Sequence, residues 1–441
     1  MKYLCIFVLL FMIFPAQAQE KPSAFCSALS DNGTYKGRYS AYEKLVEGKD
    51  NWVFRSKSEF KSSFFADSIS KRMLKQFQDA LARNGTELVI LYPPTRGMMH
   101  AEAAQFPERD KAWEEYQKTI RELDEDGIHV IGMARPPAGT SFFYKRDHHW
   151  NVVGAKAAAQ AIASKITLMD VYPVLAKKTF ETKRLPQMNY EGTFSKVLKD
   201  VCKTTLPPEA VVPEETVPAE GATTEEDLFG DSAEPEVVLV GTSNSTPQVY
   251  ANFDGALRQA LSADVLNVSV AGAGVDNPML AYLNSDHYRD KKARLIIWEV
   301  PGYYNFNALR RFLRQATPEA TGVCEKPVTQ VKGPLVEGEP IMKDLEGFNI
   351  AGGEYYLALT FAKPVKNDFK IKFSFPDKED VYAMSYEERT GALDTYFVSL
   401  RNKHKVYLED ITLEGVDENT VLVAICKMPP KVKKEQPKEK T

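Results

Sequence analysis

Two kinds of strand pattern divide the chain, and they constrain the fold more than any other feature. Before residue 322, near-continuous apolar runs alternate with stretches of helical character: 87–94, 127–133, 236–243, 263–272 and 293–301. Strands that are apolar on both faces are typical of a parallel sheet covered by helices. After Cys324 apolar and polar residues alternate, as in EYYLALTFA, FKIKFSF, DTYFVSLR, KVYLEDITLEG and TVLVAICKM. This second pattern predicts an antiparallel sandwich, so we expect an α/β domain over 19–322 and an all-β domain over 323–428.

The two ends of the chain have compositions of their own. Lys2, an apolar run over 4–14 and the small residues Ala16 and Ala18 predict an export signal over 1–18, cleaved after Ala18. An uncleaved anchor is the alternative, but the run is shorter than the ~20 residues of a spanning helix. At the other end, residues 429–441 are rich in lysine and proline, and we expect a basic, disordered tail.

An acidic segment over 207–236 interrupts the first domain. It contains ten Asp or Glu residues, no Lys or Arg, and many Pro, Ala and Thr. Such a composition predicts a disordered insertion, with a docking segment as the alternative. Without these ten charges the formal net charge of −4 becomes +6 for the rest of the chain, which would tolerate an anionic partner.

The cysteines indicate an oxidising compartment. Without Cys5 of the predicted signal, an even number remains, namely Cys26, Cys202, Cys324 and Cys426. No CxxC pair occurs, so we expect no zinc or other metal site. Three pairings are possible. The simplest joins Cys26 to Cys202 and Cys324 to Cys426, because each bridge then closes one predicted domain.

The stretch EPEVVLVGTSNS places Ser243 on a turn between an expected strand and an expected helix. A nucleophilic serine needs a histidine that takes its proton and a carboxylate that orients this histidine. The stretch RDHHWN supplies both in Asp147 and His149, ahead of an alanine-rich helix that Asn151 can cap. The alternative is purely structural: Ser243 and Asp147 cap turns, and His149 is a buried ring.

Two further stretches bear on the Ser243 hypothesis. LNVSVAGAGV contains Asn267, Gly272 and Gly274, where the backbone can approach a ligand and a glycine N–H can complete an oxyanion hole. Glycines at a strand end also form ordinary tight turns. The tripeptide Gly230-Asp231-Ser232 has the form that opens many lipases and esterases of the SGNH class, but it precedes its strand and lies in the acidic segment. Ser243 is therefore the favoured nucleophile.

The order of these motifs indicates a family. In ordinary SGNH enzymes the serine strand comes first and the Asp/His turn last, whereas here Asp147 and His149 precede Ser243. This order predicts a circularly rearranged SGNH-like parallel sheet. Together with D-x-H-W ending at Trp150, L-V-G-T-S ending at Ser243, W-E-x-P over 298–301 and the cysteine-closed β-domain, it resembles the AlgX/AlgJ family of alginate O-acetyltransferases.

The resemblance implies roles for several residues. The catalytic Ser, His and Asp fall on Ser243, His149 and Asp147, and the paired disulfides fall on the cysteines as grouped above. A tyrosine near the site falls on Tyr303 or Tyr304, of which Tyr303 is our choice. The family's β-domain resembles a carbohydrate-binding module with a tryptophan and arginines, yet all four tryptophans precede Cys324. Aromatic and arginine side chains that could replace them on an acidic sugar are Tyr382, Tyr386, Arg389 and Arg401.

The function that the resemblance implies is O-acetylation of an exported polysaccharide in the periplasm. The implied partners are an anionic, alginate-like polymer of mannuronate, an acetyl donor or donor protein of a membrane acetylation complex, and other secretion proteins. No cofactor and no nucleic acid is expected. Two alternatives remain open: an acetyl esterase with the same Ser243 site, because the triad does not decide which nucleophile attacks the acyl-enzyme, and a binding scaffold with a vestigial site.

Overall fold

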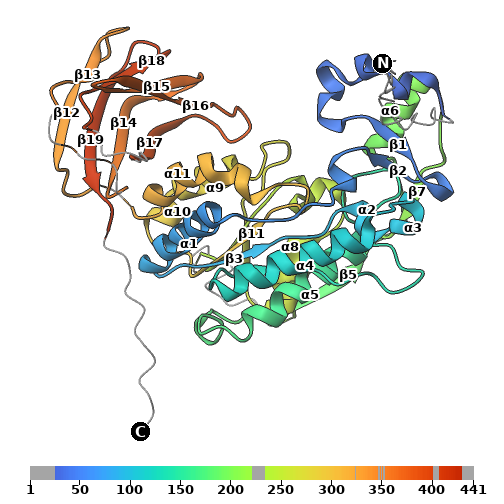
Figure 1. Cartoon of the computed structure of the whole chain (residues 1–441). Coiled ribbons are helices and arrows are strands. Elements are labelled where there is room, and N and C mark those ends of the chain that lie inside the picture. Colours follow the sequence, from blue (N-terminus) through green and yellow to red (C-terminus); the bar gives the residue numbers. More distant parts are fainter. Residues whose placement is uncertain are drawn as a thin grey trace, which may run out of the picture.

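A computed structural model describes residues 25–220, 234–322, 324–345, 348, 350, 353–400 and 407–429. The predicted signal over 1–18, Ser232 and the tail from 430 lie outside these ranges. Figure 1 shows a central α/β body, with a β-sandwich on one side and a small part formed by β1, β2 and α6 on the other. None of the described helices is long and apolar enough to cross a membrane.

The α-helices of the described residues are α1 Ser68–Arg83, α2 Arg96–Met99, α3 Ala101–Ala104, α4 Arg109–Glu125, α5 Val152–Ile166, α6 Thr193–Cys202, α8 Phe253–Leu261, α9 Asn277–Leu283, α10 Asp286–Arg289 and α11 Arg310–Glu319. Short 3-10 turns are η1 Ser27–Ser30, η2 Asn32–Tyr35, η3 Gly37–Tyr42, η4 Lys49–Asn51, η5 Ser58–Phe60, η6 Tyr172–Val174, η7 Ser243–Ser245, η8 Pro247–Val249 and η9 Phe306–Leu309.

The strands of the first domain are β1 Leu45–Glu47, β2 Val53–Arg55, β3 Glu87–Leu91, β4 Val130–Ile131, β5 Phe180–Arg184, β6 Met188–Tyr190, β7 Glu209–Val211, β8 Glu214–Pro218, β9 Val237–Val240, β10 Val265–Asn267 and β11 Leu295–Glu299. Those of the sandwich are β12 Thr329–Pro334, β13 Pro340–Met342, β14 Tyr355–Val365, β15 Phe369–Phe375, β16 Lys378–Met384, β17 Leu393–Leu400, β18 Asp410–Glu414 and β19 Thr420–Lys427.

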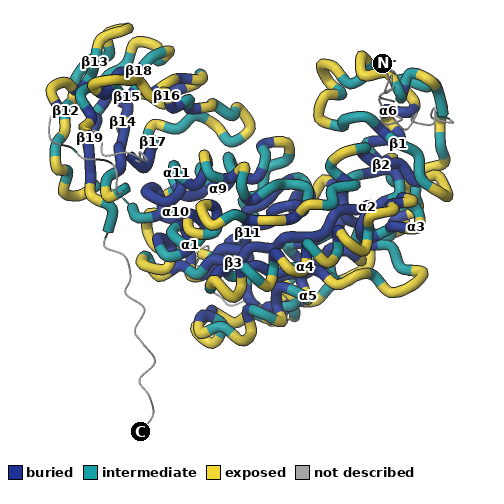
Figure 2. Tube along the Cα trace, in the orientation of Figure 1, coloured by how far each residue is buried: buried dark blue, intermediate teal, exposed yellow. Residues whose placement is uncertain are grey.

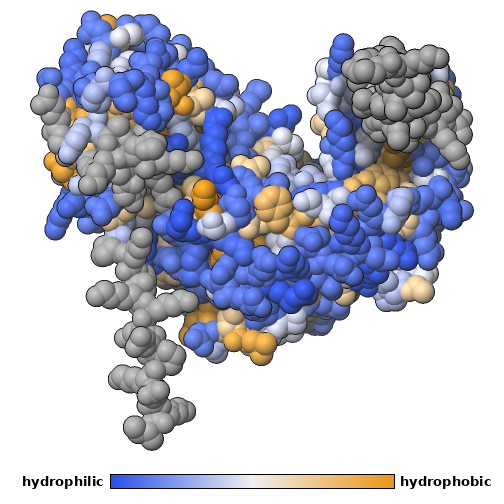
Figure 3. Space-filling view, in the orientation of Figure 1, coloured by the Kyte–Doolittle hydropathy of each residue, from blue (hydrophilic) through white to orange (hydrophobic). Residues whose placement is uncertain are grey.

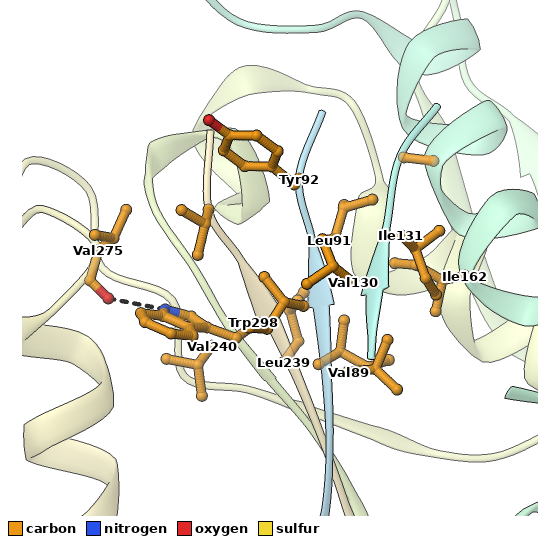
Figure 4. Close-up of a cluster of buried hydrophobic side chains, with 14 of the residues drawn as sticks. Val89, Leu91, Tyr92, Val130, Ile131, Ile162, Leu239, Val240, Val275 and Trp298 are labelled. Atoms are coloured by element: carbon orange, nitrogen blue, oxygen red, sulfur yellow. Dashed lines mark hydrogen bonds between the residues drawn. The ribbon is translucent and has the colours of Figure 1, made fainter. Parts of the chain in front are cut away.

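The central sheet has the parallel arrangement that the apolar runs predict. Its order is β10-β9-β11-β3-β4, and every pairing is parallel. β9, β11 and all of β3 but its first residue are buried, which Figure 2 shows as dark blue through β3 and β11. In Figure 4, Trp298 of β11 packs among the valines and leucines of neighbouring strands, and its indole N–H donates to the carbonyl of Val275 at 2.9 Å. All five strands therefore end at one edge of a rigid core.

Helices cover both faces of this sheet, as predicted for a doubly covered parallel sheet. α1 and α9 both pack against α11, and α5 packs against α8. The sequence also predicted how α5 begins: the Asn151 side chain accepts the N–H groups of Val153 and Gly154 at 3.0 Å each. This cap fixes the point at which the Asp147–Trp150 turn enters the helix.

The C-terminal domain is the predicted antiparallel sandwich. Its two four-stranded sheets have the orders β12-β19-β14-β17 and β13-β18-β15-β16. Disulfides join Cys26 to Cys202 and Cys324 to Cys426, which confirms the predicted pairing. The second bridge links the chain that enters the sandwich to its last strand, and the first ties the N-terminal segment to the end of α6.

The prediction of a disordered segment over 207–236 is wrong for its first part. Residues 209–218 form β7 and β8, which pair antiparallel with β6 and β5. Basic residues elsewhere in the chain compensate the acidic ones: Glu214 and Glu215 lie opposite Arg184 and Lys183 of β5. Lys156 of α5 also contacts Glu214 at 2.6 Å. Residues 221–233 lie outside the described part of the chain.

Candidate active site

The predicted site residues come from three neighbouring strand ends. Ser243 follows β9, Gly272 follows β10 and Tyr303 follows β11. Because these strands are parallel and adjacent, the chain leaves all three at the same edge of the sheet. The Asp147–Trp150 turn, which precedes α5, approaches this edge from outside the sheet.

A continuous hydrogen-bonded chain links Ser243, His149 and Asp147. The Nε2 atom of His149 lies 2.8 Å from Oγ of Ser243, and its Nδ1 lies 2.5 Å from Oδ1 of Asp147. An ionised carboxylate only accepts, so Nδ1 carries the proton and Nε2 accepts from the serine hydroxyl. Ser243 itself is partly exposed. The geometry is that of a serine poised to lose its proton to a histidine.

Asp147 is buried, and its second oxygen has partners of its own. Oδ2 accepts from the Tyr190 hydroxyl at 2.8 Å and from the Thr193 N–H at 2.7 Å. Burial acts to raise the pKa of Asp147, but the charge and hydrogen bond of His149 outweigh it and hold this pKa well below its ordinary value. The carboxylate therefore stays ionised. Tyr190 was missed from the sequence, because it lies on β6 with no motif around it.

The neighbouring histidine has a different environment. Burial lowers the pKa of His148 well below its ordinary value, and the charge of His149 adds to this effect. The ring of His148 is therefore neutral and lies 3.8 Å from that of His149, centroid to centroid. Atoms of Asp147, His148 and His149 lie within 4.8 Å of one another, a spacing that could hold a metal ion. His149 already uses both ring nitrogens in the chain to Asp147 and Ser243, so such an ion would have to displace one of these contacts.

Glu299 holds the turn that carries Ser243. It is 0% exposed at the end of β11, and its carboxylate accepts from the Thr242 N–H and hydroxyl at 2.8 Å each, from Nδ2 of Asn244 at 3.1 Å and from the Ser245 hydroxyl at 3.3 Å. Burial raises the pKa of Glu299, and these hydrogen bonds oppose that rise. The W-E-x-P motif contained the signal, since a charged residue inside an apolar strand needs partners.

Trp150 also stabilises the turn that carries Ser243, from the side opposite Glu299. Its indole N–H donates to the Asn244 carbonyl at 2.8 Å. The two halves of the site, the Asp147–Trp150 turn and the Ser243 turn, are thus joined twice: once through His149 and once through Trp150.

The stretch after β10 runs beside the Ser243 turn. The N–H of Val268 donates to Leu239 O and that of Val270 donates to Gly241 O, so the ladder between β10 and β9 continues past both strands. Gly272, two residues later, has φ +78°, a conformation that favours glycine. Asn267 differs from our expectation: its amide donates to Ser245 O and accepts from Ser269 N–H. Its side chain thus braces the turn through Ser245 O.

Tyr303 lies in a small cavity next to this site. The cavity is also lined by His148, Trp150 and Asn244, the neighbours of His149 and Ser243 in the chain. The guanidinium of Arg55 lies 4.5 Å from the centroid of the Tyr303 ring. Burial raises the pKa of Tyr303, while Arg55 acts to lower it. Arg55 was missed because β2 lies far from every motif in the sequence.

The sandwich residues predicted to bind polymer have different positions. Tyr382 is 6% exposed and its hydroxyl donates to Arg311 O of α11 at 2.7 Å, so it joins the two domains and is not available to stack on a sugar. Arg389 is exposed in the loop between β16 and β17. A Cβ added to Gly272 would come within 3.0 Å of Arg389 Nε. Arg401 lies outside the described residues.

Comparisons with known proteins agree with this architecture. Residues 45–302 match the family "SGNH hydrolase-like domain, acetyltransferase AlgX". The alginate biosynthesis protein AlgX of Pseudomonas aeruginosa is 31% identical over 394 residues, which cover 86% of this chain and 81% of that protein. A probable alginate O-acetylase AlgJ of Azotobacter vinelandii is 31% identical over 59% of this chain and 69% of its own length.

A solved structure of Pseudomonas aeruginosa AlgX superimposes with a TM-score of 0.78 at 27% identity, covering 92% of this chain and 99% of that one. The superposition therefore includes both the parallel sheet and the sandwich. With its matching domain, its curated relatives and its two-domain architecture, the chain belongs to the AlgX family of SGNH hydrolase-like acetyltransferases.

Proposed function

We propose that this protein O-acetylates an anionic, alginate-like polysaccharide through an acetyl-serine intermediate on Ser243. The observation that supports the proposal is the hydrogen-bonded chain from Asp147 through His149 to Ser243 in a member of the AlgX family. The names of the relatives, which refer to alginate biosynthesis and alginate O-acetylation, suggest the polymer.

The first half-reaction loads the serine. Oγ of Ser243 attacks the carbonyl carbon of an acetyl donor while Nε2 of His149 takes the hydroxyl proton. The tetrahedral intermediate collapses, the bond to the leaving group breaks, and His149 returns the proton to that group. Asp147 keeps Nδ1 protonated and stabilises the imidazolium, which its ionised state allows.

The second half-reaction transfers the acetyl group from Ser243 to a sugar hydroxyl. A sugar hydroxyl gives its proton to Nε2 of His149 as its oxygen attacks the acetyl carbon. The bond to Oγ of Ser243 then breaks, and the serine recovers its proton from His149. The N–H groups of Ser243 and Gly272 are the proposed donors to the oxyanion in both halves, because the loop after β10 runs beside the serine turn.

The surroundings of the serine favour a transferase over an esterase. In Figure 3 the molecule is hollowed between the sandwich and the N-terminal part. Arg389 approaches Gly272 from the sandwich, and Tyr42 contacts His148 from the N-terminal part with ring centroids 6.4 Å apart. A polymer held in this hollow would present hydroxyls to the acetyl-serine at high effective concentration, which is how a transferase competes with ~55 M water.

We place the reaction in the periplasm. Two disulfides fit an oxidising compartment, and the predicted signal over 1–18 fits export. The proposed partners are the polymer itself, an acetyl donor or donor protein of a membrane acetylation complex, and other secretion proteins.

The test is acetyl transfer to defined acceptors. Mannuronate oligomers are incubated with the full chain and an activated acetyl ester, and the added acetyl mass is measured by mass spectrometry. We expect wild type to acetylate the oligomers and Ser243→Ala to leave them unmodified. Loss of acetyl groups from pre-acetylated oligomers with no gain on bare ones would establish an esterase. Binding of oligomers without ester hydrolysis or transfer would establish a scaffold.

A further inference from the structure

Two buried arginines line the cavity beside the Ser243 site. Arg55 and Arg96 both line it, and both are buried, at 6% and 2% exposure. They share one carboxylate: Glu59 accepts from Arg55 Nε at 3.3 Å and from Arg96 at 2.6 Å. Arginine stays protonated in proteins, and the charges of Asp147 and Glu43 also act on Arg96 and Arg55, respectively. His148 in the same lining is neutral.

Two buried polar atoms of the same cavity have no hydrogen-bond partner among the described residues. They are Nε of Arg96, a donor, and Oδ1 of Asn244, an acceptor. The orientation of the Asn244 amide is fixed, since its Nδ2 donates to Glu299. A buried donor or acceptor without a partner is unfavourable. A carboxylate oxygen in the cavity would give Nε of Arg96 the acceptor that it lacks.

The size and opening of the cavity restrict that ligand. Its volume is about 20 Å³, room for about one or two water-sized groups and not for a sugar ring. All lining residues are buried except His148 and Tyr303, which are partly exposed. The ring of His148 packs against that of His149, so an opening on this side would face the Ser243 site. A small charged group can enter while the body of the ligand stays outside, near Ser243.

We propose that this cavity binds the carboxylate of the uronate residue that accepts the acetyl group, and that Arg55 is its main donor. The inference rests on the proposed function and extends it to the recognition of the acceptor. One N–H of Arg55 goes to Glu59, which leaves the two terminal NH2 groups for Tyr303 and for a carboxylate. With its carboxylate in the cavity, the same ring would direct its hydroxyls outward to the acetyl-serine.

Binding to full-length Ser243→Ala protein tests the proposal without turnover. The probes are short mannuronate oligomers and the same oligomers after chemical reduction of their carboxyl groups. We expect Arg55→Gln to weaken binding of the uronate oligomers by ~10- to 10²-fold, the worth of a charge-assisted hydrogen bond. The preference for uronate over reduced oligomers should fall by the same factor. Arg55→Lys, which keeps the charge but loses the planar fork, should give an intermediate loss.

Arg294→Gln is the matched control. Arg294 also contacts a glutamate through Nε, Glu236 at 2.5 Å, but it precedes β11 at the opposite edge of the sheet, so its loss should leave both affinities within about twofold. Equal weakening for the two kinds of oligomer, or none for either, would overturn the proposal.

A transfer assay separates this inference from the proposed function. If wild type prefers uronate oligomers in the binding assay but transfers no acetyl, the proposed function fails and the carboxylate site stands. If transfer occurs equally well to uronate and reduced oligomers, the site fails and the transferase stands. Circular dichroism of Arg55→Gln and Arg55→Lys checks that both are folded, and Arg55→Lys carries the test if Arg55→Gln is not.

Discussion

At the carboxyl edge of the parallel sheet each proposed catalytic side chain has buried partners, whereas the sandwich loop over 385–392 is largely at the surface. Asp147 accepts from His149, Tyr190 and Thr193, and Glu299 holds the serine turn with four hydrogen bonds. Arg389 contacts Glu387, two residues away in the same loop. Chemistry needs atoms fixed to fractions of an ångström, while recognition of a polymer tolerates adjustable side chains. The difference predicts large effects at the sheet edge and smaller ones in the sandwich.

The sharpest test of this comparison is removal of the nucleophile or the base. Ser243→Ala and His149→Ala should each lower acetyl transfer by ~10⁴-fold or more, and the double variant should be little worse, because the members of such a chain act as one unit. The melting temperature should stay close to that of wild type. Initial rates with an activated acetyl ester measure the effect. Additive losses in the double variant would show that the two residues act independently.

The next largest effect is expected from substitution of Glu299, the buried carboxylate that holds the Ser243 turn. Glu299→Gln keeps the size but places an NH2 group against donors, with a cost of about 1–3 kcal/mol for the unsatisfied contacts. We expect ~10- to 10²-fold slower transfer and a lower melting temperature. If the melting temperature falls while the transfer rate per folded molecule does not, Glu299 only supports the fold. Acetyl transfer would then depend less on the sheet edge than the comparison with the sandwich predicts.

Arg389 tests the sandwich side. Arg389→Ala should weaken transfer to mannuronate oligomers by about tenfold or less, mainly through a higher KM, because an exposed charge contributes at most about 1 kcal/mol. The effect should shrink as salt rises. Steady-state kinetics at two ionic strengths measure it. A loss as large as that of His149→Ala would place Arg389 in the chemical step and break the division between the two regions.

Tyr190→Phe removes one of the partners of Asp147. The remaining hydrogen bonds keep the carboxylate in place, so we expect a three- to tenfold lower kcat, equivalent to about 1 kcal/mol. The loss should appear in kcat more than in KM, because Tyr190 contacts the carboxylate behind His149. An unchanged kcat with a lower melting temperature would mean that Tyr190 only supports packing.

The smallest expected effect concerns stability at low pH. Because the pKa of Asp147 is depressed in the folded state, its contribution is complete above the ordinary value of about 3.9 and is lost as pH falls below it. Wild type should therefore lose more melting temperature than Asp147→Asn between about pH 5 and 3. If the melting temperatures of the two proteins fall in parallel, the pKa of Asp147 is the same in the folded and the unfolded state, and the prediction is wrong.

The sequence was most informative where one local pattern decides the structure. The five apolar runs became β3, β4, β9, β10 and β11, and Asn151 caps α5 as predicted. It was least informative where the partner is distant. β7 and β8 are acidic and were taken for disordered chain, yet they pair with basic β5 and with β6. Composition alone does not reveal compensation by charges more than twenty residues away.

The roles of individual site residues divide in the same way. The turn that carries Ser243, the Asp147–His149 turn and the order of the domains follow from local patterns and from their sequence along the chain. The disulfide pairing was the simplest of three possible pairings and the one that the family resemblance implied. Tertiary structure alone decided that Asn267 braces a turn, that Tyr382 lies between the domains, and that Tyr190 and Arg55 reach the site at all. The reason is physical: a short motif predicts only the conformation of its own backbone segment. The hydrogen bonds that orient a buried charge come from whichever strands and loops the fold packs around it.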